Sequence, residues 1–153
     1  MTRIDFHSNV SNQLDYACRL TRKALAAGCQ LVVRHQNQTQ LAEFDQLLWA
    51  FSDTDFLPHV TAQDPLADRT PVLLSLEAKD DASASTSHNQ ILLNLSDNIP
   101  ADFARYERLI EIVPQEAMQA GRERYRYYQQ QGYQLITSGP SQHRVAGVHR
   151  AVQ

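Results

Sequence analysis

The stretch ILLNLSDNIPADFARYERLIEIVP, residues 91–114, decides the fold class because it carries two apolar segments on either side of a short connection. Residues 91–97 and 108–113 each carry four apolar side chains, several of them consecutive, a pattern typical of strands that are buried on both faces. Residues 100–107 predict one or two helical turns, with Pro100 near the start. Strand, helical turn and strand in succession indicate a chain in which strands and helices alternate.

The same alternation extends in both directions along the chain. Further strands are expected at residues 4–6, 29–35, 71–77 and 133–137, and longer helices at residues 11–28, 39–51 and 114–132. The residues expected to cap these helices are Ser11 or Asn12, Gly28, Thr39 and Gly132. We therefore predict an α/β fold in three layers, with a mainly parallel central sheet and helices on both faces.

Length and composition are those of one ordinary domain. The chain has 153 residues, 42% of them apolar, and its net charge of −3 argues against wrapping of nucleic acid. No apolar run of about 18 residues could span a membrane, and residues 1–12 lack the apolar core of a signal peptide. We therefore expect a cytoplasmic protein without membrane contact. Residues 80–89 are expected to form a flexible loop, and residues 138–153 a C-terminal extension that frays.

The sequence lacks the usual patterns of catalytic, cofactor and metal sites. The first strand–helix junction, FHSNVSNQ at residues 6–13, has no glycine, and neither GxxxxGK[ST] nor GxGxxG occurs, so nothing predicts a phosphate-binding loop. The six histidines form neither HxxxH nor HExxH, and GxSxG does not occur. Cys18 and Cys29 are expected to be small buried side chains. We assign no catalytic, cofactor-binding or metal-binding residue; a catalytic site assembled from scattered positions stays an alternative.

One feature that stands out is the aromatic segment LLWAFSDTDFLPH, residues 47–59. Trp49, the only tryptophan, lies about 100° around its helix from Leu48 and therefore at the edge of the core-facing stripe or outside it. Phe56 and Leu57 follow in a loop, and loops usually lie on the surface. An exposed aromatic cluster tends to mark a partner surface. The alternative is that the loop folds back and buries all of these side chains.

A second feature is RERYRYY, residues 122–128. Arg122 and Arg126 share one helix face because they are four residues apart, and Tyr125 and Tyr128 are placed to face the sheet. Guanidinium groups beside aromatic rings form a good receptor for a carboxylate attached to an apolar group. The alternatives are a solvated helix face that Glu123 partly neutralises, or direct binding of single-stranded nucleic acid, which the acidic net charge disfavours.

Four segments together resemble the chi subunit of bacterial DNA polymerase III, with matching order and spacing over residues 1–137. They are FDQLLWAFSDTDFLPH (44–59), PVLLSL (71–76), ILLNLSDNIPADFARYERLIEIVP (91–114) and RERYRYYQQQGY (122–133). The combination of W-x6-FLPH, NL-x4-PADF and a late RxRYxxY helix is fairly specific. The resemblance implies one Rossmann-like domain over 1–137 that lacks a phosphate-binding loop, followed by an extension over 138–153 to which the resemblance does not extend.

The resemblance also implies a function without catalysis. Chi subunits join a second small subunit, psi, which ties them to the clamp loader, and they bind the acidic, phenylalanine-ended C-terminal tail of single-stranded DNA-binding protein. By resemblance, psi binds the loop formed by Phe56, Leu57, Pro58 and His59, and a helicase-like protein is a candidate to replace psi there. Direct contact with nucleic acid is not expected. A nucleotide-binding enzyme on a Rossmann-like scaffold is the alternative function.

The tail-binding residues implied by the resemblance lie mostly on the last long helix. Arg122 and Arg126 would receive the terminal carboxylate and the aspartates of the tail, and Val113 would form an apolar wall for the phenylalanine ring. The other residues assigned to this site are Arg124, Tyr125 and Trp49, and Trp49 is expected to lie near both partners. The segment 115–121 is about two residues shorter than the family pattern, and Met118 or Gln119 stands where a lysine is expected. One basic contact to the tail is therefore expected to be missing, with the affinity either lower or redistributed onto Arg124.

Overall fold

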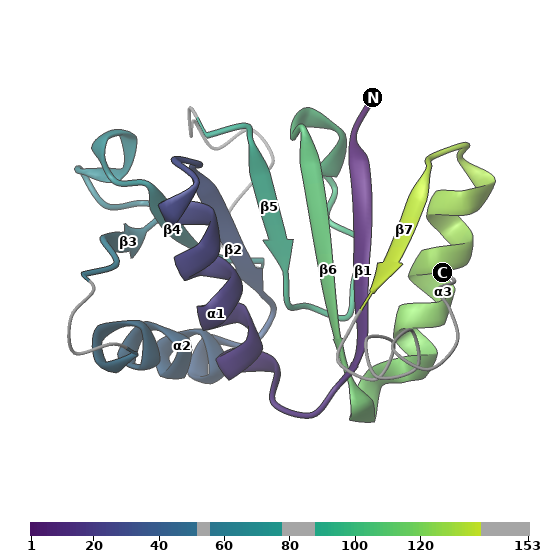
Figure 1. Cartoon of the computed structure of the whole chain (residues 1–153), viewed down its shortest axis with the longest axis horizontal. Coiled ribbons are helices and arrows are strands. Elements are labelled where there is room, and N and C mark those ends of the chain that lie inside the picture. Colours follow the sequence, from purple (N-terminus) through teal and green to yellow (C-terminus); the bar gives the residue numbers. More distant parts are fainter. Residues whose placement is uncertain (52–55, 78–87, 139–153) are drawn as a thin grey trace.

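A computed structural model describes residues 1–51, 56–77 and 88–138, which form a seven-stranded parallel sheet with helices against it (Figure 1). The strands are β1 (Arg3–Val10), β2 (Leu31–His35), β3 (His59–Thr61), β4 (Val72–Leu76), β5 (Ile91–Asn94), β6 (Arg108–Pro114) and β7 (Leu135–Ser138). The helices are α1 (Gln13–Ala26), α2 (Gln38–Ala50) and α3 (Met118–Gln130), with short 3-10 turns η1 (Ala67–Arg69), η2 (Phe103–Arg105) and η3 (Gln115–Ala117). The strand order is β3-β4-β2-β5-β6-β1-β7.

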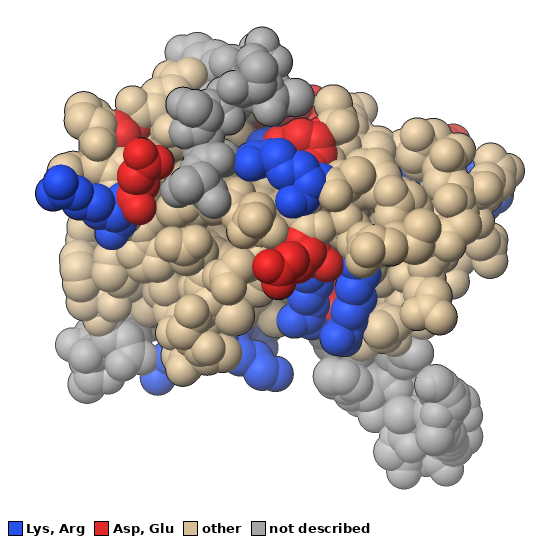
Figure 2. All heavy atoms as spheres, turned by 90° about the horizontal axis from the view of Figure 1, so that it is seen from above, with Lys and Arg blue, Asp and Glu red and all other residues tan. Residues whose placement is uncertain are grey.

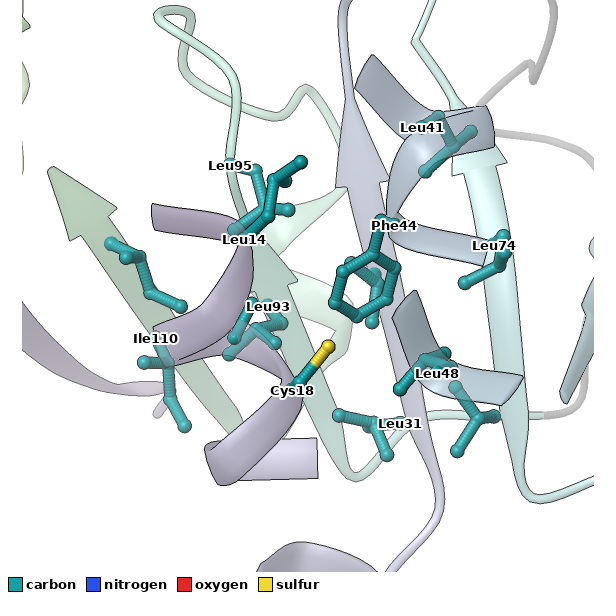
Figure 3. Packing of buried hydrophobic residues seen from close by; sticks show 14 of the residues in the cluster. Leu14, Cys18, Leu31, Leu41, Phe44, Leu48, Leu74, Leu93, Leu95 and Ile110 are labelled. Carbon is teal, nitrogen blue, oxygen red and sulfur yellow. The ribbon is translucent and has the colours of Figure 1, made fainter. Parts of the chain in front are cut away.

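Each face of the sheet has its own hydrophobic core, because successive strand residues point to opposite sides. On one face, α1 and α2 pack over alternate residues such as Leu31, Val33 and Leu93, and Phe44 fills the space between the two helices and the sheet (Figure 3). On the other face, α3 and η2 cover the intervening positions, including Val32. The three-layer α/β fold expected from continuous apolar strands is confirmed, and every strand pair is parallel.

Most of the expected helix boundaries are close to the observed ones. The Asn12 side chain accepts a hydrogen bond from the Asp15 amide at 3.1 Å and caps α1. Gly28 and Gly132 follow α1 and α3 with φ of 80° and 90°, conformations that favour glycine. The expected cap of the second helix was wrong: the α2 cap is Asn37, whose side chain accepts from the Gln40 amide at 2.9 Å.

Other differences concern short elements and segments that the structure leaves undescribed. The segment around His59 was expected to be a loop, but it begins β3, which pairs with β4 from His59 to Thr61. The first strand is longer than expected and runs to Val10. The predicted flexible loop falls mostly on residues 78–87 and the predicted extension on residues 139–153, and both ranges lie outside the described residues. Within the described part, none of the helices is long and apolar enough to cross a membrane.

Candidate functional site

The outer side of α3 carries the predicted cationic surface. Arg122 and Arg126 are exposed and lie one turn apart on the same helix face. Tyr125 is partly buried and meets the Phe6 ring edge-on, with ring centroids 5.1 Å apart. Tyr128 is fully buried against the sheet. The prediction that both tyrosines face the sheet is therefore confirmed, and the two arginines lie at the rim of the helix.

A small hollow of about 90 Å³ opens between α3 and the strands beneath it. Its lining residues are Phe6, Ser8, Val113, Met118, Gly121, Arg122, Tyr125 and Thr137. The hollow thus unites three of the residues assigned to the tail site, namely Val113, Arg122 and Tyr125. An apolar hollow with a guanidinium at its edge suits a ligand in which a carboxylate is attached to an apolar group.

Gly121 allows α3 to approach β6 closely at this hollow. A Cβ atom added at Gly121 would lie 2.6 Å from Cγ1 of Val113, which is far inside van der Waals contact. Sequence reasoning placed no importance on this glycine. The signal that could have identified it is a glycine in the interior of a helix, where it costs roughly 1 kcal/mol relative to alanine and therefore calls for a packing reason.

Neither arginine at the rim has its charge neutralised by a carboxylate among the described residues. Arg122 donates from Nη2 to Oε1 of Gln119 at 3.3 Å, a contact between two exposed side chains. Gln119 in turn donates to the Glu123 carboxylate at 3.3 Å, so this acid contacts the amide rather than Arg122. The charges of Arg122 and Arg126 are therefore available to an anionic ligand.

Arg124 does not belong to this surface, and the expectation that it takes over a basic contact was wrong. Its side chain is only 3% exposed and donates from Nε to Oε1 of Glu111 at 3.0 Å and from Nη1 to the carbonyl of Asp97 at 2.8 Å. Two residues along a helix amount to a rotation of about 200°, so Arg124 points inward when Arg122 points outward. Arg124 therefore anchors α3 to β6 and to the loop after β5.

Glu111 lies at the centre of this buried polar cluster. Tyr128 donates its hydroxyl hydrogen bond to Glu111 Oε2 at 2.7 Å, and Asn94 Nδ2 lies 3.0 Å from both carboxylate oxygens. Burial raises the pKa of the Glu111 carboxyl above its usual value and outweighs the opposite effects of Arg124, Tyr128 and Asn94. Burial also raises the pKa of the Tyr128 hydroxyl, and the neighbouring Glu111 adds to that shift.

A second exposed surface lies at the C-terminal end of α2. Trp49 and Phe56 are 54% and 68% exposed, and their ring centroids are 5.7 Å apart. The alternative in which the loop folds back and buries every aromatic residue is therefore wrong. Between residues 51 and 56 the chain is outside the described part, so we define the aromatic surface by Trp49 and Phe56 alone.

Leu57 and His59 support the aromatic surface from below. Leu57 is buried in the core under α2, and Pro58 is partly exposed. The buried His59 ring donates from Nδ1 to the Leu57 carbonyl at 2.7 Å, and its Nε2 lies 2.9 Å from a carboxylate oxygen of Asp45. Its ring centroid is 4.6 Å from that of Trp49. Of the four residues assigned to the psi site, Phe56 and Pro58 can therefore touch a partner, whereas Leu57 and His59 hold the loop in place.

The two surfaces lie toward opposite ends of the sheet, and Trp49, which was expected to lie near both partners, belongs to the aromatic surface. Helix α2 packs against β2 and β4, whereas α3 packs against β1, β6 and β7 (Figure 1). Trp49 contacts Phe56 and His59, which places it with the aromatic surface rather than with Arg122.

Other features bear on alternative functions. On the face seen in Figure 2, basic and acidic side chains neighbour one another, and neither sign gathers into a broad patch. Among the described residues, no three His, Cys, Asp or Glu side chains come together as metal ligands would. Sequence reasoning also missed a groove of about 330 Å³ between α2 and the strands β3 and β4.

Comparisons with known proteins agree with the fold and with the motifs. A family profile described as DNA polymerase III chi subunit, HolC, matches residues 1–136. A relative from Pseudomonas aeruginosa, named DNA polymerase III subunit chi, is 33% identical over 141 residues, covering 88% of this chain and 94% of the relative. Proteins of the same name from Escherichia coli and Haemophilus influenzae are 28% and 26% identical, covering 79% and 80% of this chain and 81% and 84% of their own lengths. The chain therefore belongs to the DNA polymerase III chi subunit family.

Proposed function

We propose that this replication accessory subunit is a non-catalytic adaptor with two separate binding surfaces. The hollow beside α3 binds the acidic, phenylalanine-ended C-terminal tail of single-stranded DNA-binding protein. The aromatic surface of Trp49 and Phe56 binds the psi subunit and, through it, the clamp loader. The adaptor thereby links the replicase to coated template.

The observation that carries the proposal is the hollow lined by Val113, Tyr125 and Arg122. Its apolar wall suits a phenylalanine ring, and the guanidinium at its edge suits the carboxylate that ends the same residue. Arg126 lies one turn further along the exposed helix face, where it can attract the aspartates that precede the phenylalanine. Arg124 is omitted from the proposed site because its charge is paired with Glu111 inside the protein.

Binding through such a small site is expected to be weak for a single tail. Electrostatic attraction raises the encounter rate, and burial of the phenylalanine slows release. A dissociation constant in the micromolar range corresponds to about −8 kcal/mol. Several tails on one coated strand raise the effective concentration of the ligand, so a weak individual contact is sufficient for recruitment.

Replacement of Arg122 tests the tail site. Arg122→Ala is expected to weaken binding of a labelled tail peptide by about 1–3 kcal/mol, because a charge-assisted hydrogen bond is lost. Fluorescence anisotropy at two salt concentrations measures both the affinity and its salt dependence, which should decrease in the variant. Arg69→Ala on η1 is the matched control, since it removes an exposed arginine outside α3. Equal weakening by both substitutions, or by neither, would rule out the assigned site.

Replacement of Phe56 tests the psi surface. Phe56→Ala removes the more exposed of the two neighbouring rings and is expected to impair psi binding while leaving tail-peptide binding unchanged. A helicase-like protein that competes with psi should lose affinity in the same variant. Loss of both psi and tail binding in a folded Phe56→Ala protein would contradict the assignment of separate surfaces.

A further inference from the structure

A groove lies next to the aromatic surface, between α2 and the edge of the sheet. It has a volume of about 330 Å³, within the range of sites that hold a ligand or a side chain of a partner. Its lining residues are Gln38, Leu41, Ala42, Asp45, Thr61, Ala62, Gln63, Leu74 and Leu76. Leucine and alanine side chains form most of this lining, so the groove is suited to an apolar group.

The charged residues at the groove indicate which charge an apolar ligand should carry. Among the described residues that line the groove, Asp45 alone is charged, and its side chain is partly exposed. Helix α2 also carries Glu43 but no lysine or arginine, whereas α3 carries Arg122, Arg124 and Arg126. The groove therefore favours a ligand with a positive charge beside its apolar group, the opposite of the ligand expected at α3.

A chain of contacts joins the groove to the aromatic surface. The Asp45 carboxylate at the groove lies 2.9 Å from Nε2 of His59. The His59 ring contacts Trp49, and Trp49 contacts Phe56. Asp45 and Trp49 also lie one turn apart on α2, so a partner that covers Trp49 is adjacent to the groove.

We propose that the groove is a second anchor pocket for psi, which inserts an apolar side chain there and pairs an adjacent lysine or arginine with Asp45. This inference rests on the proposed binding of psi to the aromatic surface. A second anchor strengthens binding beyond what the Trp49 and Phe56 rings supply, because binding energy concentrates in side chains that fill pockets.

The test uses substitutions that fill the groove and leave Trp49 and Phe56 unchanged. Ala42→Trp places a large ring in the groove from an exposed position on α2, and Thr61→Trp does so from the opposite wall on β3. Ala26→Trp, at the exposed end of α1, is the matched control. Calorimetric titration with the psi subunit encoded by the same genome is expected to show at least tenfold weaker binding for each groove variant and an unchanged affinity for the control.

Tail-peptide binding reports that each variant remains folded, since the hollow beside α3 lies at the other end of the sheet. Asp45→Asn should in addition reduce the salt dependence of psi binding. If both groove variants bind psi as tightly as the unmodified chain while Phe56→Ala does not, the groove inference is wrong and the proposed psi surface stands. If psi does not bind the unmodified chain, the proposed function itself fails.

Discussion

At the scale of single residues, Arg122 and Arg124 have different environments although they are two positions apart on one helix. Arg122 is exposed beside the hollow, whereas Arg124 is buried against Glu111. The sequence contains a signal for this difference: Glu111 is the only acid among the apolar residues of β6, and a buried carboxylate needs a partner. A helix that packs over β6 must supply that partner, and Arg124 does so.

Removal of Arg124 is expected to destabilise the fold in a pH-dependent manner. Arg124→Leu leaves the Glu111 carboxylate buried without its cation, which costs about 3–5 kcal/mol of unfolding free energy near pH 8. The pKa of Glu111 in the folded state is above the usual 4.5, so folding favours the protonated carboxyl. This contribution to the unfolding free energy is fully present below the unfolded-state pKa and is lost as pH rises through the folded-state pKa. Loss of Arg124 raises the folded-state pKa further, so the cost of the substitution should be smaller at pH 5 than at pH 8.

Urea denaturation at the two pH values measures this effect relative to the unmodified chain. The same substitution in a Glu111→Gln background is the control, because the amide does not titrate and the cost should then be independent of pH. An equal cost at both pH values in the Glu111 background would mean that the two side chains are not coupled as described.

The contact between Gly121 and Val113 gives a second prediction at this scale. Glycine to alanine inside a helix ordinarily stabilises by roughly 1 kcal/mol. Here the added Cβ would meet Val113 at 2.6 Å, so Gly121→Ala should instead destabilise the fold by about 1–3 kcal/mol and weaken tail binding. In a Val113→Ala background the space is open, and Gly121→Ala should become stabilising. Stabilisation of the unmodified chain by Gly121→Ala, measured by denaturation, would contradict the close packing.

At the scale of elements, the long helices and the continuous apolar strands could be predicted because each repeats its pattern over many residues. The strand β3 could not, since three residues from His59 to Thr61 give too short a pattern and follow a proline-containing loop. The exposed Arg122 and Phe56 could be predicted from helix geometry and loop position. The burial of His59 and the groove beside α2 could not, because they depend on contacts between segments distant in sequence.

The cap of α2 gives a prediction at this scale. Asn37→Ala should cost about 1 kcal/mol of unfolding free energy, because the Gln40 amide loses its side-chain acceptor. Thr39→Ala, within the first turn, should change the stability by less than about 0.5 kcal/mol. Thermal denaturation of the two variants shows which residue caps the helix, Asn37 as observed or Thr39 as expected from the sequence. The reverse order of stabilities would place the helix start at Thr39.

At the scale of the whole molecule, the sheet separates the two proposed binding surfaces. The aromatic surface lies at the C-terminal end of α2, next to His59 of β3, and the hollow lies beside α3 and is lined from β1 and β6 (Figure 1). The sheet between them is held by continuous parallel pairing, so it acts as a rigid spacer. An adaptor needs this arrangement because both partners must be held at once.

We expect both partners to bind simultaneously because the two proposed surfaces are separate. The tail peptide should bind the complex with psi with an affinity within about twofold of that for the free chain, because effects at distant sites without shared partners are nearly independent. Anisotropy of a labelled tail peptide, with and without saturating psi, measures this. Release of the peptide on addition of psi would show that the two surfaces overlap.

The central claim is that the hollow beside α3 captures the end of an acidic peptide. Calorimetry with a peptide of several aspartates and a terminal phenylalanine tests it most directly, compared with the same peptide amidated at its C-terminus. The free-acid peptide should bind with micromolar affinity, about −8 kcal/mol, and the amidated peptide at least tenfold more weakly. Equal affinity for the two peptides, or no detectable binding of the free acid, would contradict the account.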